Sequence, residues 1–116
     1  MPGDGRRLER VAQALHRELS GLLYRDLKDP RLRGVTLTSV TVTPDLRHAR
    51  IFFSHLQGAA RGQEAVEGFR SAAGFIRQKV GRALGLRYSP ELDFEYDPSI
   101  ERAARIDKLL RQEQSK

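Results

Sequence analysis

The sequence contains no cysteine among its 116 residues. Disulfide bonds, thiolate metal sites and cysteine nucleophiles are therefore all excluded. Three histidines remain, His16, His48 and His55, and none of them has a partner at the spacing of a metal site. We therefore expect no bound metal ion, and no feature of the sequence indicates another cofactor.

Long apolar runs are also absent. No segment approaches the roughly 18 consecutive apolar residues that a membrane-spanning helix needs, and residues 1–7 lack the apolar stretch of a signal peptide. With 39% hydrophobic and 31% charged residues, the composition is typical of a globular domain. We expect one cytoplasmic, monomeric domain over residues 1–116, with residues 1–5 and 112–116 frayed.

Signatures of catalysis are missing too. The sequence has no recognisable set of serine, histidine and acid, and no glycine-rich phosphate loop at a junction of strand and helix. Acids alternate at Asp93, Glu95 and Asp97, which is the ordinary pattern of the solvent face of a strand. We therefore expect no catalytic residues and no enzymatic activity.

What the sequence does have is an excess of positive charge. Its 21 lysines and arginines against 15 acids give a net charge of +6. Residues 47–87 hold eight positive and two negative charges, whereas residues 1–46 hold eight and six, and residues 88–116 hold five and seven. A basic segment of this kind favours a polyanionic partner such as nucleic acid.

The spacing of apolar residues predicts the first half of the fold. Steps of three and four predict a helix of roughly five turns that begins near Leu8 and ends before Asp29-Pro30. Residues 35–43 are mostly β-branched and predict a strand, in which either a bulge near Ser39 or burial on both faces explains the imperfect alternation. Residues 47–56 predict a second strand, which forms an antiparallel hairpin with the first.

The second half begins with a helical pattern that starts near Gln63, after a loop at residues 58–62, and holds for about six turns. Gly74 interrupts this pattern and is predicted to kink or divide the helix. Residues 91–97 alternate strictly and predict a third strand, and Asp97-Pro98 is predicted to start a short C-terminal helix. The predicted fold is an α+β domain of order α-β-β-α-kink-α-β-α, with helices packed on a three-stranded sheet.

One face of the second predicted helix combines arginines with glycines, because residues at steps of three, four and seven share a face. This face contains Arg70, Gly74, Arg77, Gly81 and Gly85, and it is flanked by Lys79, Arg82 and Arg87. Bare glycines let a phosphate backbone approach the helix, and each arginine fork donates two hydrogen bonds to phosphate. The alternative is that the glycines receive a helix of a partner protein; the basic surroundings favour RNA.

Two further groups are candidate RNA contacts. Phe52 lies beside His48 and Arg50 on the outward face of the second strand, where an aromatic ring either stacks on a base or is covered by a helix. Arginines near the N-terminus and before the second strand are candidates for additional phosphate contacts, although charged residues there are often only solvated. These are Arg6, Arg7, Arg10 and Arg47.

From about Arg7 to Leu110, the sequence resembles the bacterial ribosome-binding factor A family. The matching pieces are RVAQALHRELSGLL, DLKDPRL, VTLTSVTVTPDLRHARIFFS, SAAGFIRQKVGRALGLR and PELDFEYDPSIERAARIDKLL, in this order. The resemblance implies a type II KH-like domain. Ordinary KH domains clamp nucleic acid with a GXXG loop, whereas this family has an Ala-x-Gly kink, matched here by Ala72-Ala73-Gly74.

The resemblance also implies a function. It points to a factor that binds the free small (30S) ribosomal subunit through 16S rRNA late in assembly, helps the 5′ end of the rRNA precursor mature without cutting it, and is associated with growth in the cold. It assigns RNA contacts to Arg70, Ala72, Gly74, Arg77, Lys79, Arg82 and Arg87. The alternatives are a protein–protein adaptor that uses the glycine face, and a nuclease that acts on precursor rRNA.

Overall fold

The structure, a computed structural model, describes residues 2–114, except for the side chains of residues 2–4, 100, 101, 113 and 114. Its elements are α1 (Pro2–Arg25), the short 3-10 helix η1 (Pro30–Leu32), β1 (Val35–Val42), β2 (His48–His55), α2 (Ala59–Ser71), α3 (Ala73–Leu84), β3 (Glu91–Tyr96) and α4 (Ser99–Gln114). This order confirms the predicted α+β fold with two helices between the second and third strands. Within the described residues, no helix is both long and apolar enough to span a membrane.

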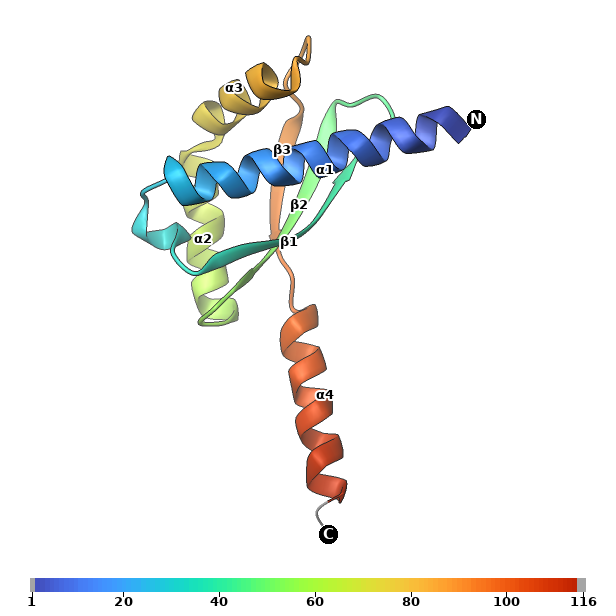
Figure 1. The fold of residues 1–116 in the computed structure, drawn as a ribbon. Helices are drawn as coiled ribbons and strands as arrows, with labels where there is room; N and C mark the ends of the chain where they lie inside the picture. The colour runs from blue at the N-terminus through green and yellow to red at the C-terminus, as the bar shows by residue number, and fades with distance from the viewer. Residues whose placement is uncertain (1, 115–116) are drawn as a thin grey trace.

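The sheet has the strand order β1-β2-β3 and is mixed. β1 pairs antiparallel with β2, which confirms the predicted hairpin, and β2 pairs parallel with β3. A parallel pair needs a crossover connection, and α2 and α3 together supply it. The helices α1, α2 and α3 lie on one side of the sheet, so its other side is open (Figure 1).

A bulge explains the irregular pattern of the first strand. Leu37 pairs with Phe53 and Ser39 pairs with Phe52, which leaves Thr38 as the extra residue. An extra residue shifts the alternation of side chains by one position. Leu37 is therefore buried and Val40 half-buried on the same inner face of the sheet. Of the two explanations that the sequence left open, the bulge is the one that the structure has.

The core lies between the sheet and the helices. The Phe69 ring of α2 packs 5.3 Å from the Phe53 ring of β2 and stacks 4.1 Å from the Phe94 ring of β3, measured between centroids. Burying a large apolar side chain of this kind contributes about 1.5–3 kcal/mol. The other buried members come from α1, η1, β1, β2, α2 and α3; they include Leu15, Leu19, Leu22, Leu32, Leu37, Ala49, Ile51, Ala65, Ile76 and Val80.

Several helix boundaries differ from the predictions. α1 begins at Pro2 instead of near Leu8, and α2 begins at Ala59, so residues 59–62 are helical where a loop was predicted. The first turns of these helices contain no large apolar residue, which is why periodicity misses them. Of the ends predicted to fray, residues 1, 115 and 116 lie outside the described residues, whereas residues 2–5 and 112–114 are helical.

The C-terminal helix is longer than predicted. α4 has 16 residues and extends away from the rest of the domain (Figure 1). Its apolar side chains Ile106, Leu109 and Leu110 are each more than half exposed. The pattern that predicts this helix is therefore correct, but its apolar residues do not join the core.

Asp97 ties the start of α4 to the bulge in β1. Its carboxylate accepts hydrogen bonds from the backbone N–H of Ser99 and from the hydroxyl of Thr38, both at 2.9 Å. These bonds hold the pKa of Asp97 below its ordinary value, and the bond from the Ser99 backbone has the largest effect. The predicted capping bond of Asp97 is thus confirmed, although α4 begins at Ser99, one residue after the predicted start at Pro98. The bulged residue Thr38 supplies a second contact.

We expect Asp97→Ala to lower the free energy of unfolding at pH 7 by roughly 1–2 kcal/mol, as for the loss of other helix N-cap side chains. The folded pKa of Asp97 is lowered, so its contribution is present above the unfolded pKa and is lost as the pH falls through the folded pKa. Urea unfolding of both proteins at pH 7 and in acid should show a difference that shrinks as the pH falls.

The control for this experiment is Asp107→Ala. Asp107 lies on exposed α4 and pairs with exposed Arg111 at 3.1 Å, so its loss should change stability by less than about 0.5 kcal/mol. Equal destabilisation in the two variants at pH 7 would contradict the anchoring role of Asp97.

Candidate nucleic-acid interface

The break between the two crossover helices lies at Ala72, so the prediction of a break at Gly74 is wrong by two residues. Ala72 ends α2, and its N–H bonds to the carbonyl oxygens of Gly68 and Phe69 at 3.2 and 3.1 Å. Gly74 is the second residue of α3. Propensity points to Gly74 because glycine is a poor helix former and alanine is the best one. The motif Ala72-Ala73-Gly74 nevertheless contains the break.

The break separates Arg70 from the rest of the predicted face. Arg70 lies near the end of α2, where its guanidinium is exposed and forms an ion pair with Glu67 at 2.9 Å. The other members of the predicted face lie on α3 or just after it. The single continuous face assumed from helical spacing therefore does not exist.

Arg77 and Gly81 point toward the chain that leads into β3. Arg77 donates to the carbonyl oxygen of Ser89 at 3.3 Å and pairs with Glu91 at 3.2 Å, while the Ser89 hydroxyl donates to the Arg77 carbonyl oxygen at 2.8 Å. A Cβ on Gly81 would lie 3.5 Å from the Cβ of Ser89. This side of α3 is thus occupied by the protein itself, and Gly81 offers little bare backbone to a ligand.

The opposite side of α3 is basic and free. Because Ile76 and Val80 are buried, Phe75, Lys79 and Arg82 turn to solvent at steps of four and three. The Nζ atom of Lys79 lies 5.5 Å from the centroid of the Phe75 ring. α3 contains no acidic residue. This side therefore presents uncompensated positive charge.

Gly74 lies at the start of the same exposed side. A Cβ placed on it would have no atom within 4 Å. The backbone at this point is thus open to a close approach, as expected from the sequence, although Gly74 is not where the helix breaks.

Arg87 extends the basic surface beyond the helix. Gly85 adopts a left-handed conformation (φ 62°), which ends α3 and redirects the chain. The Arg87 guanidinium then lies 5.6 Å from the centroid of the Tyr88 ring. Nearby, the N–H of Glu91 donates to the carbonyl oxygen of Arg47 at 2.8 Å, which brings the hairpin turn next to the loop after α3.

The N-terminal arginines lie on the first turns of α1, all exposed; they are Arg6, Arg7 and Arg10. Arg7 lines a small hollow together with Leu8 and with residues 44–46 of the hairpin turn. The structure therefore places this group beside the same hairpin turn that contains Arg47.

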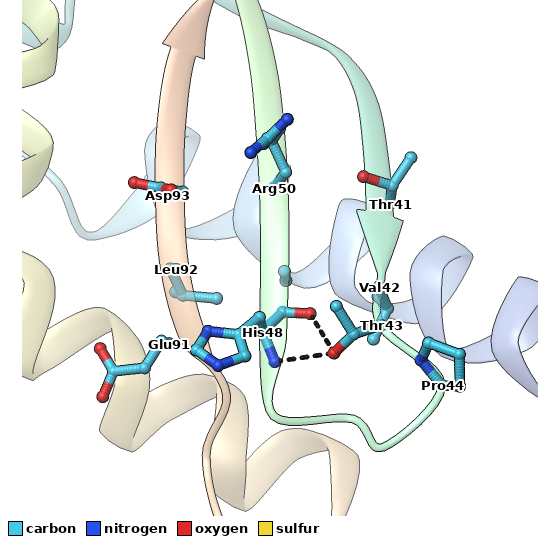
Figure 2. Close-up of a pocket in the computed structure, with 10 residues that line it drawn as sticks. Thr41, Val42, Thr43, Pro44, His48, Arg50, Glu91, Leu92 and Asp93 are labelled. Atoms are coloured by element: carbon cyan, nitrogen blue, oxygen red, sulfur yellow. Dashed lines mark hydrogen bonds between the residues drawn. The ribbon is translucent and has the colours of Figure 1, made fainter.

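Arg50, by contrast, lies on the open face of the sheet (Figure 2). Its side chain projects between Thr41 and Asp93, and its Nε is 3.7 Å from a carboxylate oxygen of Glu95. Asp93 and Glu91 are exposed on the same strand, and Glu91 pairs with Arg77 instead of Arg50. The structure does not bring Arg50 to the basic side of α3.

A hollow of about 740 Å³ lies on this open face, at the end near the hairpin turn. Its polar lining includes His48, Arg50, Glu91 and Asp93, and the Thr43 hydroxyl bonds to both the N–H and the carbonyl of His48. In the part of the chain that the structure describes, no group of three histidine or acidic side chains could hold a metal ion. Phe52 is half-buried on the same face, which no helix covers (Figure 1).

Phe75 and Tyr88 were not predicted as surface residues. Phe75 is 41% exposed and Tyr88 is 72% exposed. A signal for Phe75 was present, since it directly precedes Ile76 and so lies about 100° away from the buried stripe of the helix. The sequence contained no comparable signal for Tyr88.

Comparison with known proteins identifies relatives. The family model described as "Ribosome-binding factor A" matches residues 7–110. A ribosome-binding factor A of Acetivibrio thermocellus is 46% identical over 105 residues, which cover 90% of this chain and 85% of the relative. The crystal structure of ribosome-binding factor A from Thermus thermophilus matches with a TM-score of 0.60 at 19% identity, over 80% of this chain and 94% of that one.

A second structural match is a homology model of the Thermus thermophilus factor fitted into a cryo-EM map of a 30S complex. It has a TM-score of 0.58 at 20% identity and covers 78% of this chain and 91% of that one. At such identities the two structural matches support the fold.

We expect Arg77→Ala to lower the free energy of unfolding by roughly 1–2 kcal/mol, because it leaves the Ser89 carbonyl and the Glu91 carboxylate without their partner. Lys79→Ala, two residues further along α3 and on its exposed side, should change it by less than about 0.5 kcal/mol. Urea titrations of the two variants would check this; equal stabilities would show that Arg77 does not hold the chain into β3.

Proposed function

The chain belongs to the ribosome-binding factor A family, and from this premise we propose that it is a ribosome-assembly factor that binds the free small (30S) subunit through 16S rRNA. It acts late in assembly and assists maturation of the 5′ end of the 16S precursor, without catalysing a reaction. It works in the cytoplasm as a monomeric KH-like domain, and its action matters most for growth in the cold.

The observation that best supports this function is the free basic side of α3. Lys79 and Arg82 are exposed on a helix without acids, and neither forms an ion pair with any described residue. Cations that are not neutralised by their own protein release counterions from a phosphate backbone when they bind it, which drives association. The complex of the Thermus factor with a 30S subunit is consistent with such a ligand.

The individual predicted contacts divide into three groups under this proposal. Residues that contact rRNA directly are Arg70, Gly74, Lys79, Arg82 and Arg87, with Arg6, Arg7, Arg10 and Arg47 adding phosphate contacts near the hairpin turn. Ala72, Arg77 and Gly81 act indirectly, by setting the direction and rotation of α3. Arg50 makes no contact with the same RNA segment, because it lies among carboxylates on the open face of the sheet.

The adaptor alternative loses its main support. It needs a glycine-lined groove for a partner helix, yet Gly81 already packs against Ser89. Gly74 and Gly85 remain uncovered, but they lie at opposite ends of α3 and form no continuous groove.

We expect the double variant Lys79→Glu/Arg82→Glu to bind purified small subunits at least about tenfold more weakly. If these two residues contact phosphates, the slope of log affinity against log salt concentration should also become shallower by roughly 1.5. Co-sedimentation with small subunits across a series of salt concentrations measures both quantities.

The matched control is Arg105→Glu/Lys108→Glu. It makes the same change in net charge at two exposed residues of α4, away from α3 (Figure 1). A similar loss of affinity in both double variants would show that binding follows the total charge and not the α3 surface.

Purified protein incubated with precursor 16S rRNA and Mg²⁺ should leave the RNA uncut, because the proposed role involves binding alone. Gel analysis of the RNA ends over time, with a variant that lacks Lys79 and Arg82 as the comparison, checks this. Cleavage that depends on the wild-type protein would favour the nuclease alternative.

A further inference from the structure

Two aromatic rings lie exposed near the two ends of α3, each with a cation over its face. Phe75 is in the first turn of the helix and Tyr88 follows its C-terminal cap; they are 41% and 72% exposed. The Lys79 Nζ lies 5.5 Å from the Phe75 centroid and the Arg87 Cζ lies 5.6 Å from the Tyr88 centroid. Neither ring is needed for the core, so their positions call for another explanation.

The other aromatic residues differ from these two. Four rings pack against one another in the interior: Phe53, Phe69, Phe94 and Tyr96. Phe52 lies on the acidic open face of the sheet, and Tyr24, which is 92% exposed on α1, has no cation over its ring among the described residues. Exposure combined with a cation is thus confined to the two ends of α3.

We propose that Phe75 and Tyr88 are base-stacking residues, so that the α3 surface binds unpaired nucleotides of the rRNA. The inference rests on the proposed function and adds the kind of RNA that this surface selects. Unpaired bases expose their faces and stack on aromatic side chains, whereas the bases of a duplex are already stacked on one another. A duplex would reach only the cations of this surface.

The spacing suits a short single strand. From Phe75 to the end of α3 at Leu84, the helix rises about 14 Å, which equals about four stacked nucleotides. Lys79 and Arg82 lie between the two rings along the chain. When a base takes the ring face that the Lys79 ammonium now covers, that ammonium is in position to pair with the adjoining phosphate.

An apolar protein partner fits this surface less well. The neighbours of Phe75 on the exposed side of α3 are Gly74, Gln78, Lys79 and Arg82, so along this helix the ring is not part of an apolar stripe of the kind that marks protein docking sites. Rings separated by cations match a ligand in which flat bases alternate with phosphates.

The test compares an unstructured single-stranded RNA of about ten nucleotides with a duplex of the same length, using fluorescence anisotropy. Phe75→Leu and Tyr88→Leu should each weaken binding of the single strand roughly 5- to 100-fold and change duplex binding less than about twofold. A 2-aminopurine base within the single strand should be quenched by the wild-type protein and less so by either variant. The salt dependence should stay unchanged, because no phosphate contact is lost.

Two variants serve as controls. Phe75→Tyr keeps an aromatic ring and should retain the affinity for the single strand, while Tyr24→Leu removes an exposed ring outside the proposed site and should have no effect. Circular dichroism and urea unfolding of each variant would verify that the fold is intact.

The results separate this inference from the proposed function. One outcome is that both leucine variants bind the single strand as tightly as the wild type does, while Lys79→Glu/Arg82→Glu binds small subunits more weakly. This result would contradict base stacking by the two rings and would leave the proposed assembly role intact. If the leucine variants no longer bind small subunits but still bind both RNA probes, the rings contact a ribosomal protein, and base stacking is again contradicted. If the wild-type protein binds neither RNA nor small subunits, the proposed function itself fails.

Discussion

The parallel pairing of β2 with β3 is the constraint from which the interface follows. Glu91 starts β3 beside His48, the first residue of β2, so the chain that leaves β2 at His55 must return along the whole sheet before it can pair. α2 and α3 make this return in two steps with a break at Ala72. The Phe53, Phe69 and Phe94 rings hold α2 against both strands, and α3 is left at the edge with one side uncovered.

The rotation of α3 about its axis decides which residues meet a ligand. Ile76 and Val80 are buried, and the ties from Arg77 to Ser89 and Glu91 fix the neighbouring side of the helix. Because of this rotation, Lys79 and Arg82 lie on the side of α3 that faces solvent. The packing of the helix is enough to expose them, without an ion pair of their own. Two arginines that look alike in the sequence, Arg77 and Arg82, therefore differ in their surroundings: Arg77 is bonded to the chain that leads into β3, whereas Arg82 is exposed, and only Arg82 is a direct RNA contact in the proposed function.

Sequence patterns predicted the elements well because burial on one face imposes a period on strands and helices alike. The alternation around Ser39 even indicated the bulge, although only pairing with Phe52 and Phe53 distinguishes it from burial on both faces. Helix propensity could not place the break at Ala72, since alanine favours helix; it pointed to Gly74, and the resemblance to the family's Ala-x-Gly kink pointed to the same part of the chain. That error extended one helical face across the break, grouped Arg70 with Gly81, and drew attention away from Phe75.

Charge summed along the chain also misjudges the surface, because neighbouring residues of a strand face opposite sides of the sheet. Arg50 belongs to the basic segment 47–87 by position, yet it lies on the open face with Glu91, Asp93 and Glu95. The domain thus has an acidic sheet face and a basic helix side. Such a separation orients a protein in the field of a polyanion before contact. Under the proposed function, the acids of β3 therefore do not weaken RNA binding but direct the α3 side, with Lys79 and Arg82, toward the phosphates.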